Sequence, residues 1–322
     1  MQMNRRSFLK LGALATAASS FTPSMLANEA KKDLVIYGAP ATISATGAVA
    51  ASRGVLAQKY NTSFITWKNP DELRAGIASG LINITMAPSN LGVVLSNKGQ
   101  KMRMLNLLTD GLLSVLSYDK EIKKLSDLKG KKIVCSFKND MPDIVLQSLL
   151  KAQKLELDIT YTSGAPESMQ LLLAGKFDHA VVSEPITSVA LMQAKAQGKE
   201  IHRAFHLNDE MKSTFDLDYI PLAGMIVRES LWLEQAEMIN QLHEDQKAAL
   251  EFINSNPDEA VEIISKSLPL PKPALAASLK TSKLVVRRAK EHKDDILRFY
   301  KILFDLNPQI FGGKLPSDDF FI

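Results

Sequence analysis

The sequence predicts an α/β protein made of two lobes. Short apolar runs of strand length alternate with amphipathic helical stretches along most of the chain, and this alternation is typical of sheets that helices cover on both faces. Two similar units occur at 79–90 and 174–185, where a glycine precedes an apolar run that ends in proline and polar residues. Because ligands bind at the carboxyl ends of strands in open α/β sheets, we expect a ligand site between the lobes.

The first part of the chain predicts one βαβα lobe. Strands are expected at 34–37, 64–67, 82–86 and 102–107, and helices follow the first three of them. Thr42 or Ser44 is expected to cap the helix after the first strand, because a hydroxyl accepts from the free N–H groups of a helix start. Leu73 and Ile77 form an apolar stripe at i, i+4 on a helix at 70–79. This order predicts a mostly parallel sheet.

A turn at 126–132 is expected to lead into a new strand of the second lobe. Strands at 132–135, 159–161, 179–182 and 200–205 alternate with helices, and Gly175, like Gly80, is expected in the left-handed conformation that ends a helix. A run at 223–227 predicts a strand that returns to the first lobe. The tail is expected to be helical, with Asn256 and Glu259 forming a capping box.

The N-terminus determines the expected compartment. Residues 4–10, with Arg5 and Arg6, resemble a twin-arginine export signal, and the apolar run at 11–21 is too short for a permanent membrane span. Cleavage is expected near Ala27 or Ala30, and an uncleaved anchor is the alternative. No cysteine follows the run, so a lipoprotein anchor is excluded. We therefore expect a periplasmic protein.

Charge and cysteine content exclude other classes. The chain has 39 Lys and Arg residues against 35 Asp and Glu residues. Three of the basic residues, Arg5, Arg6 and Lys10, lie in the expected leader. The remainder is close to neutral and offers no charge footprint for nucleic acid. The one cysteine, Cys135, excludes an internal disulfide. Since it lies in an apolar run, we expect a buried, inert thiol.

The order of these elements resembles the periplasmic substrate-binding proteins of ABC importers, in the NMT1/THI5-like group that includes sulfonate, taurine, nitrate and thiamine-precursor binders. The stretches that carry the resemblance are 80–83, 126–132, 175–178 with Glu184 and Pro185, and 256–260. It implies a two-lobed type II periplasmic-binding-protein fold with two hinge crossings, near 114–118 and 215–221, and hinge closure on the ligand. The implied division is an export signal at 1–30, a first lobe at 31–116 and 218–322 with a helical tail, and a second lobe at 117–217.

The resemblance also implies the partners. We expect a monomer that uses the Tat translocase during export and delivers a small molecule to an inner-membrane ABC permease with its ATPase. No cofactor, metal or enzymatic activity is expected.

Several helix starts are expected to converge on the cleft, because their unpaired N–H groups and positive dipole ends hold oxyanions without a side-chain cation. The candidate ligand-binding residues lie at these starts or beside the second crossing: Thr42, Ser44, Trp67, Ser89, Asn90, Ser136, Lys138, Asn139, Glu184 and Tyr219.

Each candidate also has a purely structural explanation. The hydroxyl and amide residues are expected either to bind the ligand or to cap their own helices. Trp67 and Tyr219 are expected to provide aromatic walls or to pack in the core and the hinge. Lys138 supplies charge or lies solvated at the surface. Glu184 accepts from an amine on the ligand or favours its own helix start.

The arginines and histidines limit the ligand and enzyme alternatives. Arg53, Arg74 and Arg228 lie within or beside regular elements, so no arginine clamp for a carboxylate is visible. The sequence therefore favours a sulfonate-like oxyanion, or a neutral heterocycle stacked on Trp67, over an amino acid as the ligand. His202 and His206 have metal-ligand spacing only if helical, and their segment is expected to be a strand.

Alternatives outside import stay open. Pyrimidine-synthesising relatives share the fold but carry a cysteine cluster that this sequence lacks. Menaquinone-pathway enzymes also share the fold, but they work in the cytoplasm and would not need an export signal. A periplasmic ligand sensor is the third alternative.

Overall fold

The protein is represented by a computed structural model that describes residues 31–268 and 270–322; the expected export signal at 1–30 lies outside them. Residues 32–322 form one unit with two sheets. The first sheet contains β1 (Asp33–Gly38), β2 (Asn61–Thr66), β3 (Ile84–Pro88), β4 (Met102–Thr109), β10 (Ala223–Arg228) and β11 (Leu284–Arg288). The second contains β5 (Leu113–Ser117), β6 (Lys132–Ser136), β7 (Asp158–Thr162), β8 (His179–Ser183) and β9 (His202–His206).

Helices connect the strands and form the tail. They are α1 (Ser44–Arg53), α2 (Val55–Lys59), α3 (Pro70–Ala78), α4 (Leu91–Asn97), α5 (Met141–Gln153), α6 (Ala165–Leu173), α7 (Ile186–Ala196), α8 (Leu207–Phe215), α9 (Glu229–Glu234), α10 (Ala236–Ser255), α11 (Pro257–Ile264), α12 (Lys272–Thr281) and α13 (Lys293–Leu306), with short 3₁₀ turns η1 (Leu125–Leu128), η2 (Pro308–Phe311) and η3 (Asp318–Phe320). The two-lobed α/β fold is therefore confirmed. The tail is mostly helical as expected, but its strand β11 was not predicted.

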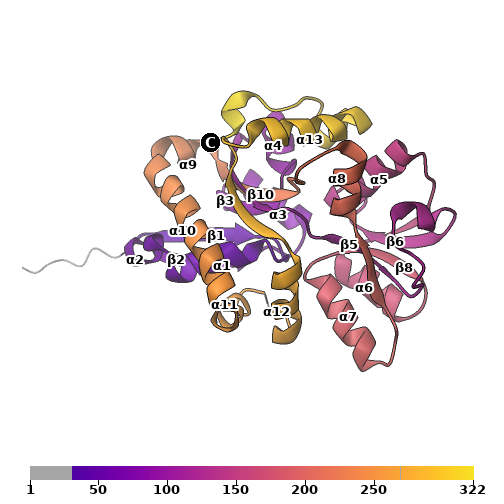
Figure 1. The fold of residues 1–322 in the computed structure, drawn as a ribbon. Helices are drawn as coiled ribbons and strands as arrows, with labels where there is room; N and C mark the ends of the chain where they lie inside the picture. The colour runs from indigo at the N-terminus through magenta and orange to yellow at the C-terminus, as the bar shows by residue number, and fades with distance from the viewer. Residues whose placement is uncertain (1–30, 269) are drawn as a thin grey trace, which may run out of the picture. The chain divides into compact units, whose positions relative to one another are not determined.

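The sheets are mixed, so the prediction of a mostly parallel first sheet is wrong. The strand order is β11-β4-β10-β3-β1-β2 in the first sheet and β7-β6-β8-β5-β9 in the second. β1 pairs in parallel with β2 and β3, but β10, orange in Figure 1, inserts antiparallel between β3 and β4. Gly224 makes this insertion possible, because a Cβ there would lie 2.0 Å from the carbonyl oxygen of Asn106. The expected return of 223–227 to the first sheet is confirmed.

The chain crosses between the sheets at two places. It first leaves β4 after Thr109 and enters β5 at Leu113, so this crossing precedes the predicted 114–118, most of which lies within β5. The second crossing runs from α8 to β10, in agreement with the predicted 215–221. Asp110 holds the two crossings together, since its Oδ1 accepts from the backbone N–H of Ile220 at 3.0 Å.

Two local predictions have different outcomes. Gly80 and Gly175 have φ angles of 80° and 69°, which confirms the left-handed helix ends. Asn256 precedes α11 as expected, but its side chain makes no capping hydrogen bond. Glu259, the other predicted member of the box, instead pairs with Arg53 of α1 at 2.6 Å. A long-range ion pair has replaced the local hydrogen bonds of a capping box.

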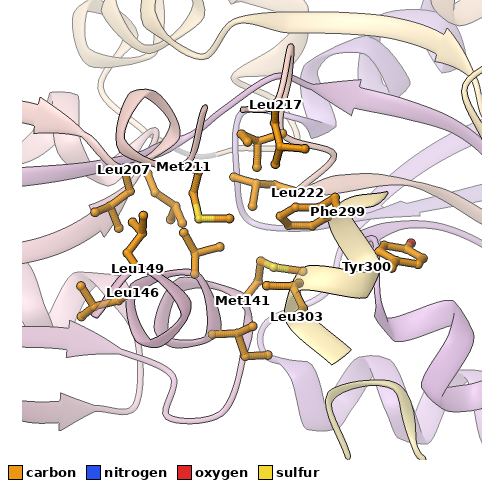
Figure 2. Packing of buried hydrophobic residues seen from close by; sticks show 14 of the residues in the cluster. Met141, Leu146, Leu149, Leu207, Met211, Leu217, Leu222, Phe299, Tyr300 and Leu303 are labelled. Atoms are coloured by element: carbon orange, nitrogen blue, oxygen red, sulfur yellow. The ribbon is translucent and has the colours of Figure 1, made fainter. Parts of the chain in front are cut away.

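One buried cluster joins the second sheet to the C-terminal helix. It combines β4, β5 and β6 with α5, α8 and α13, and Figure 2 shows Phe299 and Leu303 of α13 beside Met141 and Leu222. Tyr300 of the same helix donates to the backbone carbonyl of Ser89 at 2.6 Å. Thus α13 packs against elements of both sheets.

Cys135 lies in β6 and is fully buried. Burial raises the pKa of its thiol, which therefore stays protonated and inert, as expected. Among the described residues, no helix has the length and apolarity that spanning a membrane requires.

A buried polar network joins α10 to the first sheet. Asn106 of β4 donates to Gln246 Oε1 at 2.7 Å and lies 3.2 Å from His243 Nδ1. Burial is the main cause that lowers the pKa of His243 to about 4, and the nearby Arg288 contributes. The imidazole is therefore neutral at pH 7.

We expect Leu303→Ala to lower the free energy of unfolding by about 3 kcal/mol, because it leaves a cavity in the cluster that α13 shares with α5. Urea denaturation of the full chain measures this change. The matched control is Leu233→Ala, whose side chain is 73% exposed and should change stability by less than about 0.5 kcal/mol. Equal effects of the two substitutions would contradict the packing role of α13.

Acid should destabilise the protein through His243. Its folded pKa of about 4 lies below the unfolded value of about 6.5, so the unfolded state binds more protons between these values. Stability is then full above about pH 6.5 and falls as the pH drops towards 4, by at most about 1.4 kcal/mol per pH unit. Urea denaturation at pH 7 and pH 5 should show a smaller pH difference for His243→Gln than for the unmodified chain; an unchanged difference would refute the assignment.

Candidate functional site

A cavity of about 640 Å³ lies between the two sheets. The first sheet and its helices contribute the segments 39–41 and 66–70, together with Ile43, Leu73, Arg74, Pro88, Asn90, Leu91, Val94, Lys98, Leu222 and Ala223. The second sheet and its helices contribute Leu113, Phe137, 139–142, 163–166, Ser183 and Ile186. Leu112 of the first crossing and Leu268, Leu270, Gln309 and Ile310 of the tail complete the lining.

Helix starts dominate this lining. The cavity is bordered by the residues that open α1, α3, α4, α5, α6 and α7. The arrangement follows from the sheets, because parallel strands end at one edge and each of β1, β2, β3, β6, β7 and β8 leads into a helix. The positive ends of helix dipoles therefore surround the cavity from both sheets.

The walls are largely apolar. Trp67, Phe137, Met141 and several leucines, isoleucines and prolines form most of the surface. The cationic side chains in the lining are Lys68, Arg74 and Lys98, and none of them is buried. The cavity therefore suits a molecule with an apolar or aromatic body, with backbone N–H groups as donors for any oxyanion.

Arg74 and Asp140 form an ion pair across the cavity. Arg74 lies on α3 beside the first sheet, Asp140 precedes α5 beside the second, and their Nη2 and Oδ1 atoms are 3.0 Å apart. Burial raises the pKa of Asp140, and the charge of Arg74 opposes that rise. Arg74 lies within a helix, as the sequence predicted, and it also lines the cavity, where Asp140 pairs with it.

Three of the predicted ligand-binding residues line the cavity: Trp67, Asn90 and Asn139. Trp67 is 7% exposed, and its Nε1 donates to the carbonyl oxygen of Met86 at 3.3 Å. Asn90 donates to the carbonyl oxygen of Ile310 at 3.0 Å. Trp67 thus belongs to a buried cluster of the first sheet and to the cavity wall at once.

Thr42, Ser44, Ser89 and Ser136 are buried and are not among the described residues that line the cavity. The predicted capping role is wrong for Thr42 and Ser44. Ile43 is the N-cap residue of α1, Ser44 donates to the carbonyl oxygen of Ala39 at 2.6 Å, and Thr42 donates to Ser278 of α12 at 3.4 Å. Both hydroxyls therefore bind distant or preceding parts of the chain.

Lys138 and Tyr219 also lie outside the described lining. Lys138 is exposed, with its Nζ 5.3 Å from the centre of the Tyr161 ring. Tyr219 donates to Asp295 of α13 at 3.0 Å, and the guanidinium of Arg287 lies 4.4 Å from its ring centre. These contacts favour the surface explanation for Lys138 and the packing explanation for Tyr219.

Glu184 follows β8 and is buried, with its side chain 1% exposed. Its carboxylate pairs with Arg203 of β9 and accepts from the Thr281 hydroxyl at 2.7 Å and the Ser188 N–H at 3.1 Å. These protein groups occupy both oxygens. Glu184 therefore joins the second sheet to α12, and its neighbours Ser183 and Ile186 line the cavity instead.

Sequence reasoning missed Phe137 and the tail residues of the lining. Phe137 follows β6 inside a stretch that had been singled out for its polar neighbours. Leu268 and Leu270 precede α12 and have no local pattern that predicts a cavity wall.

The described residues contain no group of three or more His, Cys, Asp or Glu side chains placed to hold a metal. His202 and His206 are the two ends of β9, so the strand prediction is confirmed and the helical metal-ligand spacing does not arise.

Comparison with known proteins identifies relatives of this fold. The model of the family described as NMT1/THI5 like matches residues 64–260. No curated protein matches the chain. Among solved structures, an ABC transporter from Parabacteroides distasonis has a TM-score of 0.74 at 19% identity, over 90% of this chain and 99% of its own.

Two sulfonate-binding proteins also share the fold. The periplasmic aliphatic sulphonate binding protein SsuA from Escherichia coli has a TM-score of 0.66 at 16% identity, over 84% of this chain and 92% of its own. The alkanesulfonate-binding protein SsuA from Xanthomonas axonopodis pv. citri, bound to MOPS, has a TM-score of 0.63 at 13% identity, over 91% of this chain and 97% of its own. The fold is that of periplasmic binding proteins.

Glu184→Gln should lower the free energy of unfolding by about 2 kcal/mol, because it leaves the Arg203 charge without a carboxylate in a largely buried site. Thr281→Val removes only one hydrogen bond to the same carboxylate and should cost about 1 kcal/mol. Urea denaturation measures both. A Glu184→Gln protein as stable as the unmodified chain would show that the pair does not hold these elements together.

Proposed function

The chain belongs to the NMT1/THI5-like family, and from this premise we propose that it is a solute-binding protein of an ABC importer. It captures a small molecule between its sheets and delivers it to an inner-membrane permease with its ATPase. The proteins of similar fold that are named as an ABC transporter or as sulfonate binders support this proposal. The observation that carries it is a cavity bordered by helix starts from both sheets.

The proposed ligand is a sulfonate-like oxyanion with an apolar body or a small heterocycle. Backbone N–H groups at helix starts suit an oxyanion, and the apolar walls with Trp67 suit a ring or an alkyl chain. The bordering residues Trp67, Asn90 and Asn139 are the proposed contacts among the original candidates. The other candidates lie outside the described lining of the cavity: Thr42, Ser44, Ser89, Ser136, Lys138, Glu184 and Tyr219.

The proposed location is the periplasm. It rests on the twin-arginine pattern of residues 4–10 and on the periplasmic binding protein that shares the fold. The proposal includes export by the Tat translocase, cleavage of the leader and a monomeric mature protein without catalytic activity. Enzymes of the same fold, and a ligand sensor of the periplasm, are the alternatives.

Thermal-shift measurements on the full-length chain test the proposal. The panel contains alkanesulfonates, nitrate, pyrimidines and amines. A compound present at 100 times its dissociation constant should stabilise the protein by about 2.7 kcal/mol. Trp67→Ala should abolish the shift, and Trp232→Ala should keep it, because Trp232 is the other tryptophan and lies outside the described lining. If no compound shifts the melting midpoint while one is converted to product, the enzyme alternative replaces the proposal.

A further inference from the structure

The loop between β6 and α5, residues 137–140, has an unusual backbone. Phe137 and Asn139 have φ angles of 58° and 64°, in the left-handed region that bulky side chains rarely adopt. Three hydrogen bonds hold the loop. Phe137 N–H donates to Thr162 O at 3.0 Å, Asp140 N–H donates to Phe137 O at 3.0 Å, and Asn139 N–H donates to Asp143 Oδ2 at 2.8 Å. A costly conformation is thus fixed by its surroundings, which is common at binding sites.

The conformation places the Phe137 side chain in the cavity wall. Its ring lies over Gly164 at the start of α6, where an added Cβ would be 3.6 Å from the ring. Among the described residues, Phe137 is absent from all the buried hydrophobic clusters and from the partly buried residues that pack against them. The ring therefore contributes surface to the cavity and little to the core.

The same loop holds the ion pair across the cavity. Asp140 is the N-cap residue of α5, where an aspartate usually accepts from the N–H groups of its own helix. Here its side chain makes no capping hydrogen bond, and its Oδ1 lies 3.0 Å from Arg74 Nη2 on the opposite side. Arg74 also contacts Asp71 of its own helix at 3.2 Å. Asp140 thus makes an ion pair between the two lobes and no capping hydrogen bond to its own helix.

We propose that this loop couples occupation of the cavity to its closure, with Phe137 contacting the bound molecule and Asp140 holding Arg74 of the opposite lobe. The proposal rests on the proposed function and adds to it the residues that sense the molecule. A molecule that packs against Phe137 stabilises the loop conformation, and that conformation presents Asp140 to Arg74. The Arg74–Asp140 ion pair, called the latch below, holds the two lobes together, and a molecule in the cavity favours its formation.

The closure part is tested without any ligand. Spin labels at Lys59→Cys on α2 and Lys176→Cys after α6 attach at exposed positions of the two lobes, while Cys135 is buried and protected. Pulsed electron paramagnetic resonance on the full chain should give a longer and broader distance distribution for Asp140→Asn and for Arg74→Gln than for the unmodified sequence. Asp71→Asn is the matched control, because it removes the other carboxylate beside Arg74 within the same helix. Equal distributions for Asp140→Asn and Asp71→Asn would overturn the latch.

The sensing part is tested with 8-anilinonaphthalene-1-sulfonate, which combines an aromatic body with a sulfonate and fluoresces in apolar surroundings. Phe137→Gly should weaken its binding by about tenfold, because it removes an aromatic wall. Glycine adopts a positive φ without steric cost, so the backbone of the loop can stay as it is. Asp140→Asn and Arg74→Gln should each weaken it by about threefold, and the double variant by no more, since the pair is only partly shielded from water. Asp71→Asn should bind as the unmodified chain does.

The outcomes separate the latch from the proposed function. If the unmodified protein binds the dye, Trp67→Ala loses it, and the loop variants bind normally, the latch is wrong and the binding function stands. If the unmodified protein binds neither the dye nor any compound of the thermal-shift panel, both proposals fail. Additive effects of Asp140→Asn and Arg74→Gln would show that the two residues act separately and would also overturn the latch.

Discussion

The site depends on one constraint, the common direction of the strands that precede its helices. Parallel pairing of β1 with β2 and β3, and of β6 with β7 and β8, brings the carboxyl ends of these strands together within each sheet. Helices then begin where the strands end, and their starts border a shared cavity. Partial positive charge reaches the cavity through the backbone, so a bound oxyanion needs no buried lysine or arginine.

The tail helices support this arrangement from outside the sheets. Thr281 of α12 reaches Glu184 at the end of β8, and Tyr300 of α13 reaches the carbonyl of Ser89 after β3. In both cases a side chain from the tail fixes a segment directly beside a cavity-lining residue. The protein therefore uses its C-terminal helices to hold the strand ends whose positions define the site.

Much of the fold is predictable from the sequence because its signals are local. Apolar runs, the left-handed glycines Gly80 and Gly175, and Pro70 at a helix start each act within a few residues. They identify the strands and helices, and the strand end at Trp67 identifies one wall of the site. The position of β10 between β3 and β4 follows from pairing over a long sequence separation, which no local pattern reports. The mixed character of the sheets was missed for that reason.

The difference between local and long-range signals also explains which site residues the sequence could predict. Ser44 and Thr42 occupy positions typical of caps, but Ala39 and Ser278 accept from their hydroxyls instead. Glu184 accepts from the Ser188 N–H of its own helix, as its helix-start explanation expects, and also pairs with the distant Arg203. Conversely, Arg74 lies inside a helix and reaches the cavity because Asp140 faces it across the gap. Such choices depend on residues far away in the sequence, and only the folded chain shows them.

The proposed function requires that helix starts of both sheets enclose one small molecule. Hydrogen–deuterium exchange of the full chain, with and without saturating 8-anilinonaphthalene-1-sulfonate, tests it most directly. We expect added protection at 41–45, 67–70 and 88–92 of the first sheet together with 139–142, 163–167 and 183–187 of the second. Protection confined to the helix starts of one sheet, or located away from both sets, would contradict it.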